Sequence, residues 1–468
     1  MHQTAILQAP MGSSPSCRGL FPNPLADFFR CPPELIETTL TEEPDSSPSR
    51  SLFEHSPDRA LRWLNNLRRE DSELRLPRDA AQVIGNLRYE RYSVRSLTAA
   101  SALLSSESVR RLYYHLRPTL KPSIRKGIQR VFLRDWEKIP FPEWPVDTSV
   151  ERILENLLIR SIRKNKLERI PFIWFWPDGA TAAAVITHDV ETRAGLDCIP
   201  RLIDIDESFD IRSSFQLVPE GRYNVTTPLI DYIRERDCEI NIHDFDHSGN
   251  LFGDRDKYVN KAEQINKYVA AYDAEGFRAA CMYRNLDLYD KLRISYDMSV
   301  PNVAHLEPQR GGCCTVFPYF VGNILELPLT TIQDHALLNI LGSHSIDLWR
   351  VQAEMILERN GLVSFIVHPD YIMTEEALKV YRGLLNYIMH LRCHNQLWCV
   401  RPGDVNRWWR ERSAMKLVRD GGKYRIVGAG RQRARIAFAA IQNERIVYEI
   451  EPGFESFSAL DCLGGEHA

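Results

Sequence analysis

Long apolar runs are absent from this chain, although 44% of its 468 residues are hydrophobic. No stretch approaches the roughly 18 uninterrupted apolar residues of a membrane-spanning helix, so we expect no membrane span. The N-terminal residues, MHQTAILQAPMGSS, also lack the basic start and the roughly 7–15-residue apolar core of a secretory signal. We therefore expect a cytoplasmic protein.

A large excess of either charge is absent as well. The 59 lysines and arginines nearly balance the 62 aspartates and glutamates, which leaves a formal net charge of -3. A dedicated nucleic-acid-binding protein usually carries a strong basic excess, so we expect no nucleic-acid partner. The ten cysteines are scattered and include no pair at CxxC spacing. We interpret them as reduced thiols rather than as a metal or redox site.

Two N-terminal regions carry no catalytic cluster. Residues 1–57 hold nine of the 27 prolines together with serine-rich patches. Such a composition buries little apolar surface, so we predict a largely irregular segment. Residues 58–165 place apolar residues at three- and four-residue intervals, as in DRALRWLNNLRRE and VERILENLLIRSIRKNK, which predicts amphipathic helices. We interpret this helical region as a cap or as a docking surface for a protein partner.

From about residue 170 to residue 412, short apolar runs alternate with helical segments. The strand-like runs TAAAVIT, SSFQLV, CEINI and GLVSFIVH are each followed by a segment with helical spacing. This alternation predicts an α/β fold with a parallel sheet. About seven such repeats favour a closed or nearly closed (β/α) barrel over an open doubly wound sheet. Residues 414–452 alternate apolar and polar positions between turns, which predicts a small appendix of β-hairpins.

Polar residues gather where the predicted strands end. The strand TAAAVIT runs into His188, Asp189, Val190 and Glu191. Residues two apart along an extended chain point to the same side, so Asp189 and Glu191 are predicted to face one site. Two such carboxylates either hold a cation together or divide into a metal ligand and a general base. The structural alternative is a capped loop start, because Asp often follows a strand.

Two histidines follow the strand CEINI, with His243 and His247 separated by three residues. Histidines four positions apart meet on one side of a helical turn, which lets both imidazoles bind one metal ion. An HxxxH pattern also arises by chance in a chain with 13 histidines. Its position directly after a predicted strand favours the metal site.

Further polar groups follow three other predicted strands. Arg278, in GFRAA, carries a guanidinium that keeps a neighbouring carboxylate ionised, unless it is simply an exposed strand arginine. His368 follows GLVSFIV and can act as a general acid with an unshifted pKa, or serve as a buried structural histidine. LELPLTTIQDH supplies Asp334 and His335, and we expect one of them to orient His368.

The segment from about Thr181 to Asp404 resembles the polysaccharide deacetylases with chitooligosaccharide-deacetylase homology, carbohydrate esterase family 4. Five motifs carry the resemblance, in the family's order: THDVE, HDFDH, GFRAACMYRNLDLYDKLRISYDMS, LELPLTTIQDH and VSFIVHPDY. HxxxH alone is a weak signal, whereas five motifs in order are a strong one. The N-terminal helices and the β appendix lie outside the resemblance.

The resemblance implies a distorted (β/α) barrel and a hydrolase of non-peptide carbon–nitrogen bonds. The implied substrate is an N-acetylated amino sugar or glycan precursor. The implied cofactor is one divalent metal ion, by ligand preference Zn²⁺, held by one carboxylate with His243 and His247. An aspartate of THDVE would take the proton of the attacking water, and His368 would protonate the leaving amine. A backbone N–H near Cys281, in the Arg278 segment, would complete the oxyanion site.

One departure from the family concerns the first motif, which usually has two adjacent aspartates. Here Asp189 is followed by Val190, and the next carboxylate is Glu191. We predict Asp189 as the base and Glu191 as the metal ligand, and the reverse assignment stays open. Two other functions also stay open: hydrolysis of a small non-sugar amide, and carbohydrate binding or scaffolding without catalysis. Loss of His368 or of a metal ligand would have favoured an inactive protein, and none is lost.

Overall fold

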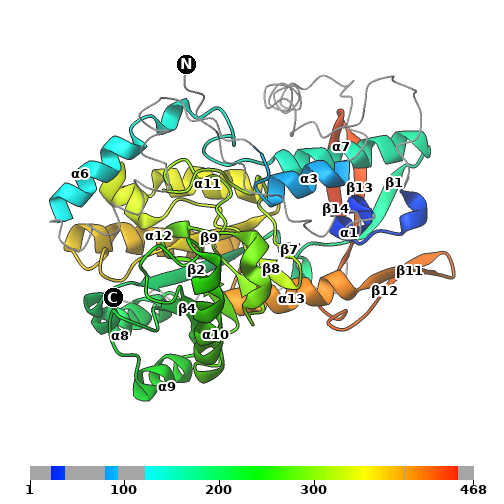
Figure 1. The fold of residues 1–468 in the computed structure, drawn as a ribbon. Coiled ribbons are helices and arrows are strands. Elements are labelled where there is room, and N and C mark those ends of the chain that lie inside the picture. The colour runs from blue at the N-terminus through cyan, green and yellow to red at the C-terminus, as the bar shows by residue number, and fades with distance from the viewer. Residues whose placement is uncertain (1–22, 37–79, 93–121, 396, 452–468) are drawn as a thin grey trace, which may run out of the picture.

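The computed structural model describes residues 23–36, 80–92, 122–395 and 397–451. Figure 1 shows a large sheet surrounded by helices on one side of the molecule and several small strands on the other. The predicted helix DRALRWLNNLRRE, residues 58–70, lies outside the described residues. In the described ranges, no helix combines the length and the apolar character needed to cross a membrane.

A nine-stranded sheet forms the centre of the molecule, in the order β10-β2-β3-β4-β5-β6-β8-β7, with β9 also paired to β2. Eight of these strands run parallel and β7 runs antiparallel to β8, one parallel strand more than the roughly seven predicted. The strands are β2 (Ala182–Val190), β3 (Ser214–Leu217), β4 (Glu239–His243), β5 (Gly276–Arg278), β6 (Tyr296–Asp297), β7 (Tyr319–Val321), β8 (Ile324–Glu326), β9 (Leu362–Ile366) and β10 (Leu397–Cys399).

The sheet curls into a distorted barrel, which confirms the predicted α/β class. No backbone ladder joins β8 to β9 among the described strands. Instead, Thr330 Oγ1 donates to Leu362 O at 2.8 Å, and Thr331 Oγ1 donates to Ser364 O at 2.8 Å. The Ser364 N–H donates back to Thr330 Oγ1 at 2.9 Å. Two threonine side chains therefore bridge the gap where the ladder is missing.

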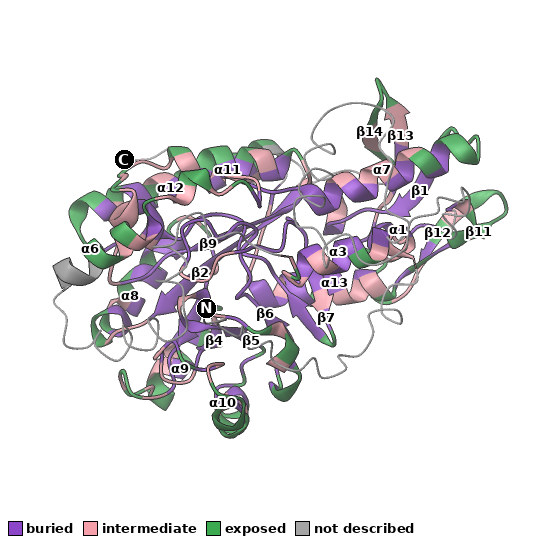
Figure 2. Cartoon of the chain, turned by 45° about the horizontal axis from the view of Figure 1, so that its top comes forward, coloured by how far each residue is buried: buried purple, intermediate pink, exposed green. Residues whose placement is uncertain are grey.

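Helices cover the outside of the barrel, and their exposed residues form the rim in Figure 2. Two of them begin at side-chain caps, which satisfy N–H groups that have no partner inside a helix. Thr192 Oγ1 accepts the N–H of Gly195, and Asp254 accepts the N–H groups of Asp256 and Lys257. The helices are α8 (Arg193–Glu207), α9 (Thr227–Glu235), α10 (Arg255–Ala271), α11 (Asp347–Leu357), α12 (Glu375–Asn395) and α13 (Pro402–Ala414).

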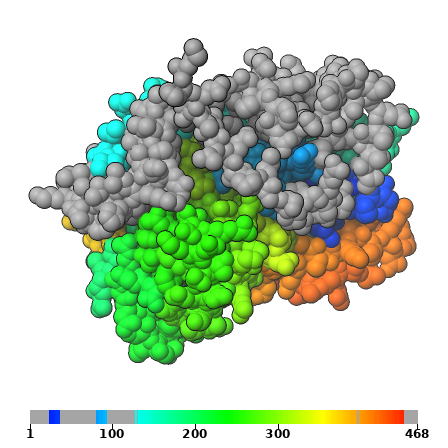
Figure 3. Space-filling model, viewed as in Figure 1, coloured from blue at the N-terminus to red at the C-terminus, as the bar shows by residue number. Residues whose placement is uncertain are grey.

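The other side of the molecule combines N-terminal helices with two small antiparallel sheets. In the space-filling view, the C-terminal strands in orange lie next to the barrel residues in green and yellow-green (Figure 3). The helices are α1 (Pro24–Phe29), α3 (Ala80–Arg88), α6 (Pro122–Leu133) and α7 (Ser149–Lys164). One sheet has the order β1 (Arg169–Ile173), β13 (Ile436–Gln442), β14 (Arg445–Ile450), and the other pairs β11 (Lys416–Asp420) with β12 (Lys423–Val427).

One predicted boundary differs from the structure where β1 meets the C-terminal strands. Residues 170–173 were expected in the barrel, but β1 pairs with the C-terminal β13, so the barrel begins at β2. Within residues 1–57, which were expected to be largely irregular, residues 23–36 contain α1 and a 3₁₀ turn. Phe29 is buried with its ring 5.4 Å from that of Phe172, and the Phe28 ring lies 5.0 Å from that of Phe317. These two phenylalanines bury enough apolar surface to order the segment despite its prolines.

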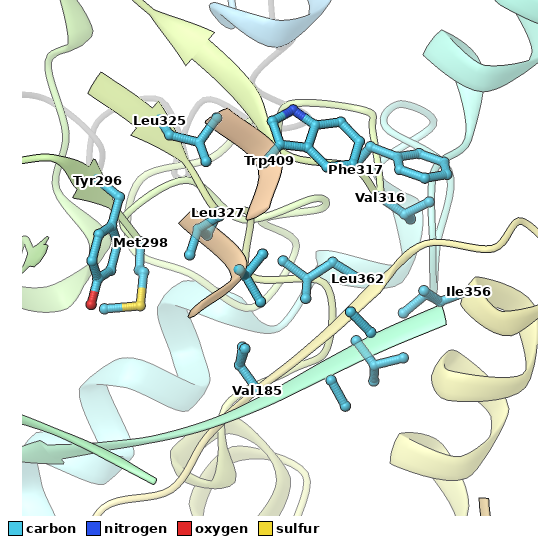
Figure 4. Packing of buried hydrophobic residues seen from close by; sticks show 14 of the residues in the cluster. Val185, Tyr296, Met298, Val316, Phe317, Leu325, Leu327, Ile356, Leu362 and Trp409 are labelled. Carbon is cyan, nitrogen blue, oxygen red and sulfur yellow. The ribbon is translucent and has the colours of Figure 1, made fainter. Parts of the chain in front are cut away.

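One hydrophobic core runs through both sides of the molecule. Figure 4 shows Val185 and Leu362, from adjacent barrel strands, facing Leu325 and Leu327 beyond, with Phe317 and Trp409 at the edge toward the second region. Because the strands are packed on both faces, their positions are fixed by close packing. The strand ends therefore form a rigid platform for the polar residues that follow them.

Candidate active site and metal centre

The carboxyl end of β2 brings a carboxylate against a guanidinium. Thr187 and Asp189 point to the inside of the barrel, and Arg278 Nη1 from β5 donates to Thr187 Oγ1 at 2.8 Å and to Asp189 Oδ1 at 2.6 Å. Arg278 Nε also donates to Met298 O at 3.1 Å, and the arginine is fully buried. Burial alone would raise the pKa of Asp189, but Arg278, followed by His243, lowers it below its ordinary value. Asp189 is therefore held in place as an ionised acceptor.

The second polar segment follows β4, where His243 and His247 lie with ring centroids 4.7 Å apart. The predicted helical turn is wrong, because residues 245–247 form bends and both Asp244 and His247 have positive φ, 58° and 53°. A left-handed residue at each end of this loop turns the second ring back toward the first. His243 Nδ1 lies 3.1 Å from Arg278 O, so its N–H donates there and Nε2 is left with a lone pair.

Glu191 joins the two histidines into a group that fits a metal ion. Its Oε1 lies 2.9 Å from His247 Nε2 and 4.0 Å from His243 Nε2, and the ligand atoms of all three residues lie within 4.8 Å of one another. His243 Nε2 and His247 Nδ1 are buried without a hydrogen-bond partner, and His247 Nε2 faces the Glu191 carboxylate. Buried polar atoms are rarely left unpaired. One carboxylate and two imidazoles are also a common donor set for zinc, with an open position for water or substrate.

The third segment follows β9, where His368 is held by Asp334. Asp334 Oδ1 lies 2.6 Å from His368 Nδ1, and Asp334 Oδ2 accepts the backbone N–H of His368 at 2.7 Å. Asp334 is thus the orienting residue of the two that were considered, whereas the ring of His335 lies 5.5 Å from that of Tyr371. Tyr371 also lies against His368, with ring centroids 4.7 Å apart. Both contacts fix the plane of the His368 ring.

The remaining nitrogen of His368 faces the metal-ligand group. His368 Nε2 lies 3.4 Å from Glu191 Oε1, so β2, β4 and β9 deliver their side chains to a single point. Burial would lower the pKa of His368, but Asp334, followed by Glu191, raises it well above its ordinary value. The expected unshifted pKa is therefore wrong. Burial would raise the pKa of Glu191, but His247 and then His243 hold it well below its ordinary value.

Cys281 lies just beyond Arg278, in the 3₁₀ turn Ala280–Met282. Cys281 and Met282 both have positive φ, 55° and 52°. Consecutive left-handed residues that are not glycine cost free energy and persist only where the surroundings impose them. This turn reorients the backbone at the place where an oxyanion donor was predicted. That role of the Cys281 N–H stays a prediction.

Three further residues, to which the sequence pattern gave no role, contact these groups or lie beside them. Thr187 shares the Arg278 guanidinium with Asp189, and its position two residues earlier on the same strand could have indicated this. Tyr371 packs on His368 three positions away, and no spacing rule for loops predicts such a contact. His188 lies on the opposite face of β2, toward the helices, where it contacts Asp206.

No family model matches the chain, and no curated protein matches it. Several solved structures match about half of it. A protein from Mycobacterium smegmatis named as a polysaccharide deacetylase covers 51% of this chain and 93% of its own, with 17% identity and a TM-score of 0.40. The peptidoglycan deacetylase PdaC from Bacillus subtilis covers 50% and 95%, with 8% identity and a TM-score of 0.32. BA3943 from Bacillus anthracis, named as a pseudoenzyme of family CE4, covers 49% and 68%, with 11% identity and a TM-score of 0.30.

Two of these structures are named as deacetylases and one as a pseudoenzyme of family CE4. Their identities and TM-scores are too low to transfer an activity to this chain. The function of this chain therefore has to be inferred from the side chains that meet at the carboxyl ends of β2, β4, β5 and β9.

Proposed function

We propose that this protein is a metal-dependent hydrolase that removes an N-acetyl group from an amino sugar or glycan precursor. The observation that carries the proposal is that one carboxylate, three histidines and an Asp–Arg pair converge on one point. Glu191 Oε1 lies within 4.0 Å of nitrogens from His243, His247 and His368, with the Asp189–Arg278 pair beside them. Metal ligands, a base and an acid are the components that amide hydrolysis requires.

Glu191, His243 and His247 would hold the divalent ion. When bound, the ion supplies Lewis-acid polarisation of the amide carbonyl and makes water more acidic. His243 Nε2 has no hydrogen-bond partner and lies 4.0 Å from Glu191 Oε1 and 3.7 Å from Asp189 Oδ2. Zn²⁺ is the metal that this donor set favours, and Glu191 is preferred to Asp189 as the carboxylate ligand because its Oε1 also lies 2.9 Å from His247 Nε2.

Asp189 and His368 divide the proton transfers between them. Asp189 is kept ionised by Arg278, so it accepts the proton of the attacking water. His368 is kept protonated by Asp334, so it donates a proton from Nε2 to the leaving nitrogen. The two residues stand at the ends of the neighbouring strands β2 and β9, and would act on the attacking water and on the leaving nitrogen, respectively. A backbone N–H near Cys281 would stabilise the oxyanion.

A single experiment tests this function. The purified protein is analysed for bound divalent metal, and acetate release is measured on a panel of N-acetyl sugars and small non-sugar amides. We expect about one metal ion per chain and metal-dependent acetate release from the sugars. Turnover of the small amides alone would move the substrate class away from glycans. Bound metal without turnover of either class would support a binding protein instead.

A further inference from the structure

His188 is a buried histidine that the proposed chemistry does not use. It lies on the face of β2 opposite Asp189 and has no exposed surface. Its Nδ1 lies 3.0 Å from Val367 O, and its Nε2 lies 3.0 Å from Asp206 Oδ2 on α8. Both ring nitrogens of this histidine are therefore occupied. His188 cannot serve as a metal ligand or contact a substrate.

The partners of His188 fix its ring rather than leave it free to turn. Asp206 Oδ2 also accepts from Ser213 Oγ at 2.7 Å, and Asp206 Oδ1 accepts from Tyr381 Oη of α12 at 2.5 Å. The Val367 carbonyl can only accept a hydrogen bond, so the Nδ1 of His188 donates its N–H there, while Nε2 contacts the Asp206 carboxyl group. Every group in this network is paired, which makes it rigid.

The position of the network along the chain is what connects it to the site. The in-register pairing of β2 with β9 ends at Thr187 and Ile366, and the Val367 N–H donates to Thr187 O at 3.0 Å. Beyond this point β9 leaves the sheet, and Val367 O faces the side chain of His188. His188 directly precedes Asp189, and Val367 directly precedes His368. The imidazole thus joins the residue before the base to the residue before the acid.

We propose that His188 is a positioning residue that sets the spacing between Asp189 and His368. Backbone pairing no longer fixes this spacing, because the ladder ends before both residues. Asp334 holds His368 from one side through its ring and its N–H. His188 holds the carbonyl of Val367, the residue before His368, from the other side. This inference rests on the proposed function for the roles of Asp189 and His368, but not for the contact itself.

The test compares His188→Phe with the control Tyr381→Phe in the full-length, metal-loaded protein. The first variant removes both N–H groups and keeps a ring of similar size. The second removes one hydrogen bond from the same Asp206 and leaves the link to Val367 intact. Misplacing a reacting group by about 1 Å costs roughly 100-fold in rate, so we expect kcat on an N-acetyl sugar to fall by roughly 10- to 100-fold in His188→Phe only. Metal content and KM should stay close to those of the wild type.

A spectroscopic measurement provides a readout that does not depend on turnover. The protein is labelled with ¹⁵N-histidine, and the His368 signals are assigned by their loss in His368→Gln. We expect the His368 signals to shift or broaden in His188→Phe and to stay in place in Tyr381→Phe. A comparable change in both variants, or no change in His188→Phe, would overturn the proposal.

The outcomes also separate this inference from the proposed function. If the wild type releases no acetate, the proposed function fails, while the ¹⁵N signals still decide whether His188 fixes His368. If His188→Phe does not fold, His188→Gln replaces it, since its amide can donate to only one of the two acceptors. One of the two links is then lost, so the His368 signals should still shift from those of the wild type. His368 signals in His188→Gln that match those of the wild type would overturn the proposal.

Discussion

The two ends of the barrel sheet both bury polar side chains, but they differ in whether these side chains have hydrogen-bond partners. At the amino end, Asn241 Nδ2 donates to Ser214 Oγ at 2.9 Å and to Tyr296 Oη at 2.6 Å, and its Oδ1 accepts the Gly276 N–H at 2.6 Å. Glu239 Oε2 accepts the N–H of Gly403, at the start of α13, at 2.8 Å. We call these residues, Ser214, Glu239, Asn241 and Tyr296, the amino-end cluster; none of their buried side-chain atoms lacks a partner.

The carboxyl end leaves buried atoms unpaired. His243 Nε2, His247 Nδ1 and Arg278 Nη2 make no hydrogen bond. An unsatisfied buried polar group costs about 1–3 kcal/mol, so a cluster of them persists only where another requirement outweighs stability. Burial and polarity alone therefore do not distinguish a functional cluster from a structural one. The two clusters differ in whether their buried polar atoms have hydrogen-bond partners. We therefore predict that changes at the carboxyl end affect function, whereas changes at the amino end affect stability.

The largest effect is expected from His243→Ala. Removing this imidazole leaves Glu191 and His247 as the only predicted ligands, so the divalent ion should be lost and turnover with it. The barrel should stay folded, because the substitution removes a group whose Nε2 was unpaired. Metal analysis and circular dichroism measure both outcomes. His335→Ala is the matched control and should retain metal; wild-type metal content in His243→Ala would show that the ligand assignment is wrong.

The next effect separates base from ligand. Asp189→Asn keeps the size of the side chain and one oxygen, but it removes the proton acceptor beside Arg278. If Asp189 is the base, metal content stays at the wild-type level while kcat falls by roughly 10²–10⁴-fold. Metal analysis and steady-state kinetics on the same preparation decide the matter. Loss of the ion instead would give the ligand role to Asp189 and leave Glu191 as the base.

An effect of similar size on amides, but a smaller one on esters, is expected from His368→Gln. The variant cannot protonate a leaving amine, but an activated acetate ester has a leaving group that needs no proton. We therefore expect acetamide hydrolysis to fall by roughly 10²–10⁴-fold, with a much smaller loss on the ester. The two rates are compared at constant metal content. Equal losses on both substrates would make His368 a structural residue of the carboxyl end.

How far the sequence predicts this molecule depends on whether a feature is local. The parallel strands, the hairpins of residues 414–452 and the strand-end positions of Asp189, His243 and His368 follow from periodicity and spacing. The pairing of β1 with β13 does not, because an apolar strand carries no signal for its partner 260 or more residues away. The prediction of a helical turn between His243 and His247 was wrong, because HxxxH spacing fits a left-handed loop as well as a helix.

The N-terminal segment shows the limit of composition. Prolines and serines predicted a largely irregular chain over residues 1–57, and within it Phe28 and Phe29 lie in the main core. A few aromatic side chains can outweigh the average of a segment when a complementary surface exists, here Phe172 and Phe317. The hydrogen-bond partners within the site are likewise not readable from the sequence. That Asp334 rather than His335 contacts His368 depends on tertiary packing, which two adjacent residues in a sequence do not reveal.

The smallest effect is expected at the amino end, from Glu239→Gln. Burial raises the pKa of Glu239 from 4.5 to about 7, despite hydrogen bonds from Asn241 and from the Gly403 N–H. The folded chain then keeps this proton between pH 4.5 and about 7, whereas the unfolded chain releases it. The stability that Glu239 contributes is therefore complete below pH 4.5 and is lost as the pH rises through about 7.

Glutamine resembles the protonated carboxyl and does not titrate. The melting temperature of Glu239→Gln minus that of the wild type should thus increase from pH 5 to pH 8, by a few degrees at most, while kcat stays unchanged. Other buried acids with raised pKa values, such as Glu151, cancel in this difference because both proteins contain them. Tyr296→Phe is the control, since it removes a hydrogen bond and keeps the carboxyl, so its melting difference should change less with pH.

A flat difference for Glu239→Gln would mean that the hydrogen-bond donors around Glu239 outweigh burial and keep it ionised. A fall in kcat would mean that the amino-end cluster is not purely structural, and the contrast between the two ends of the sheet would not hold.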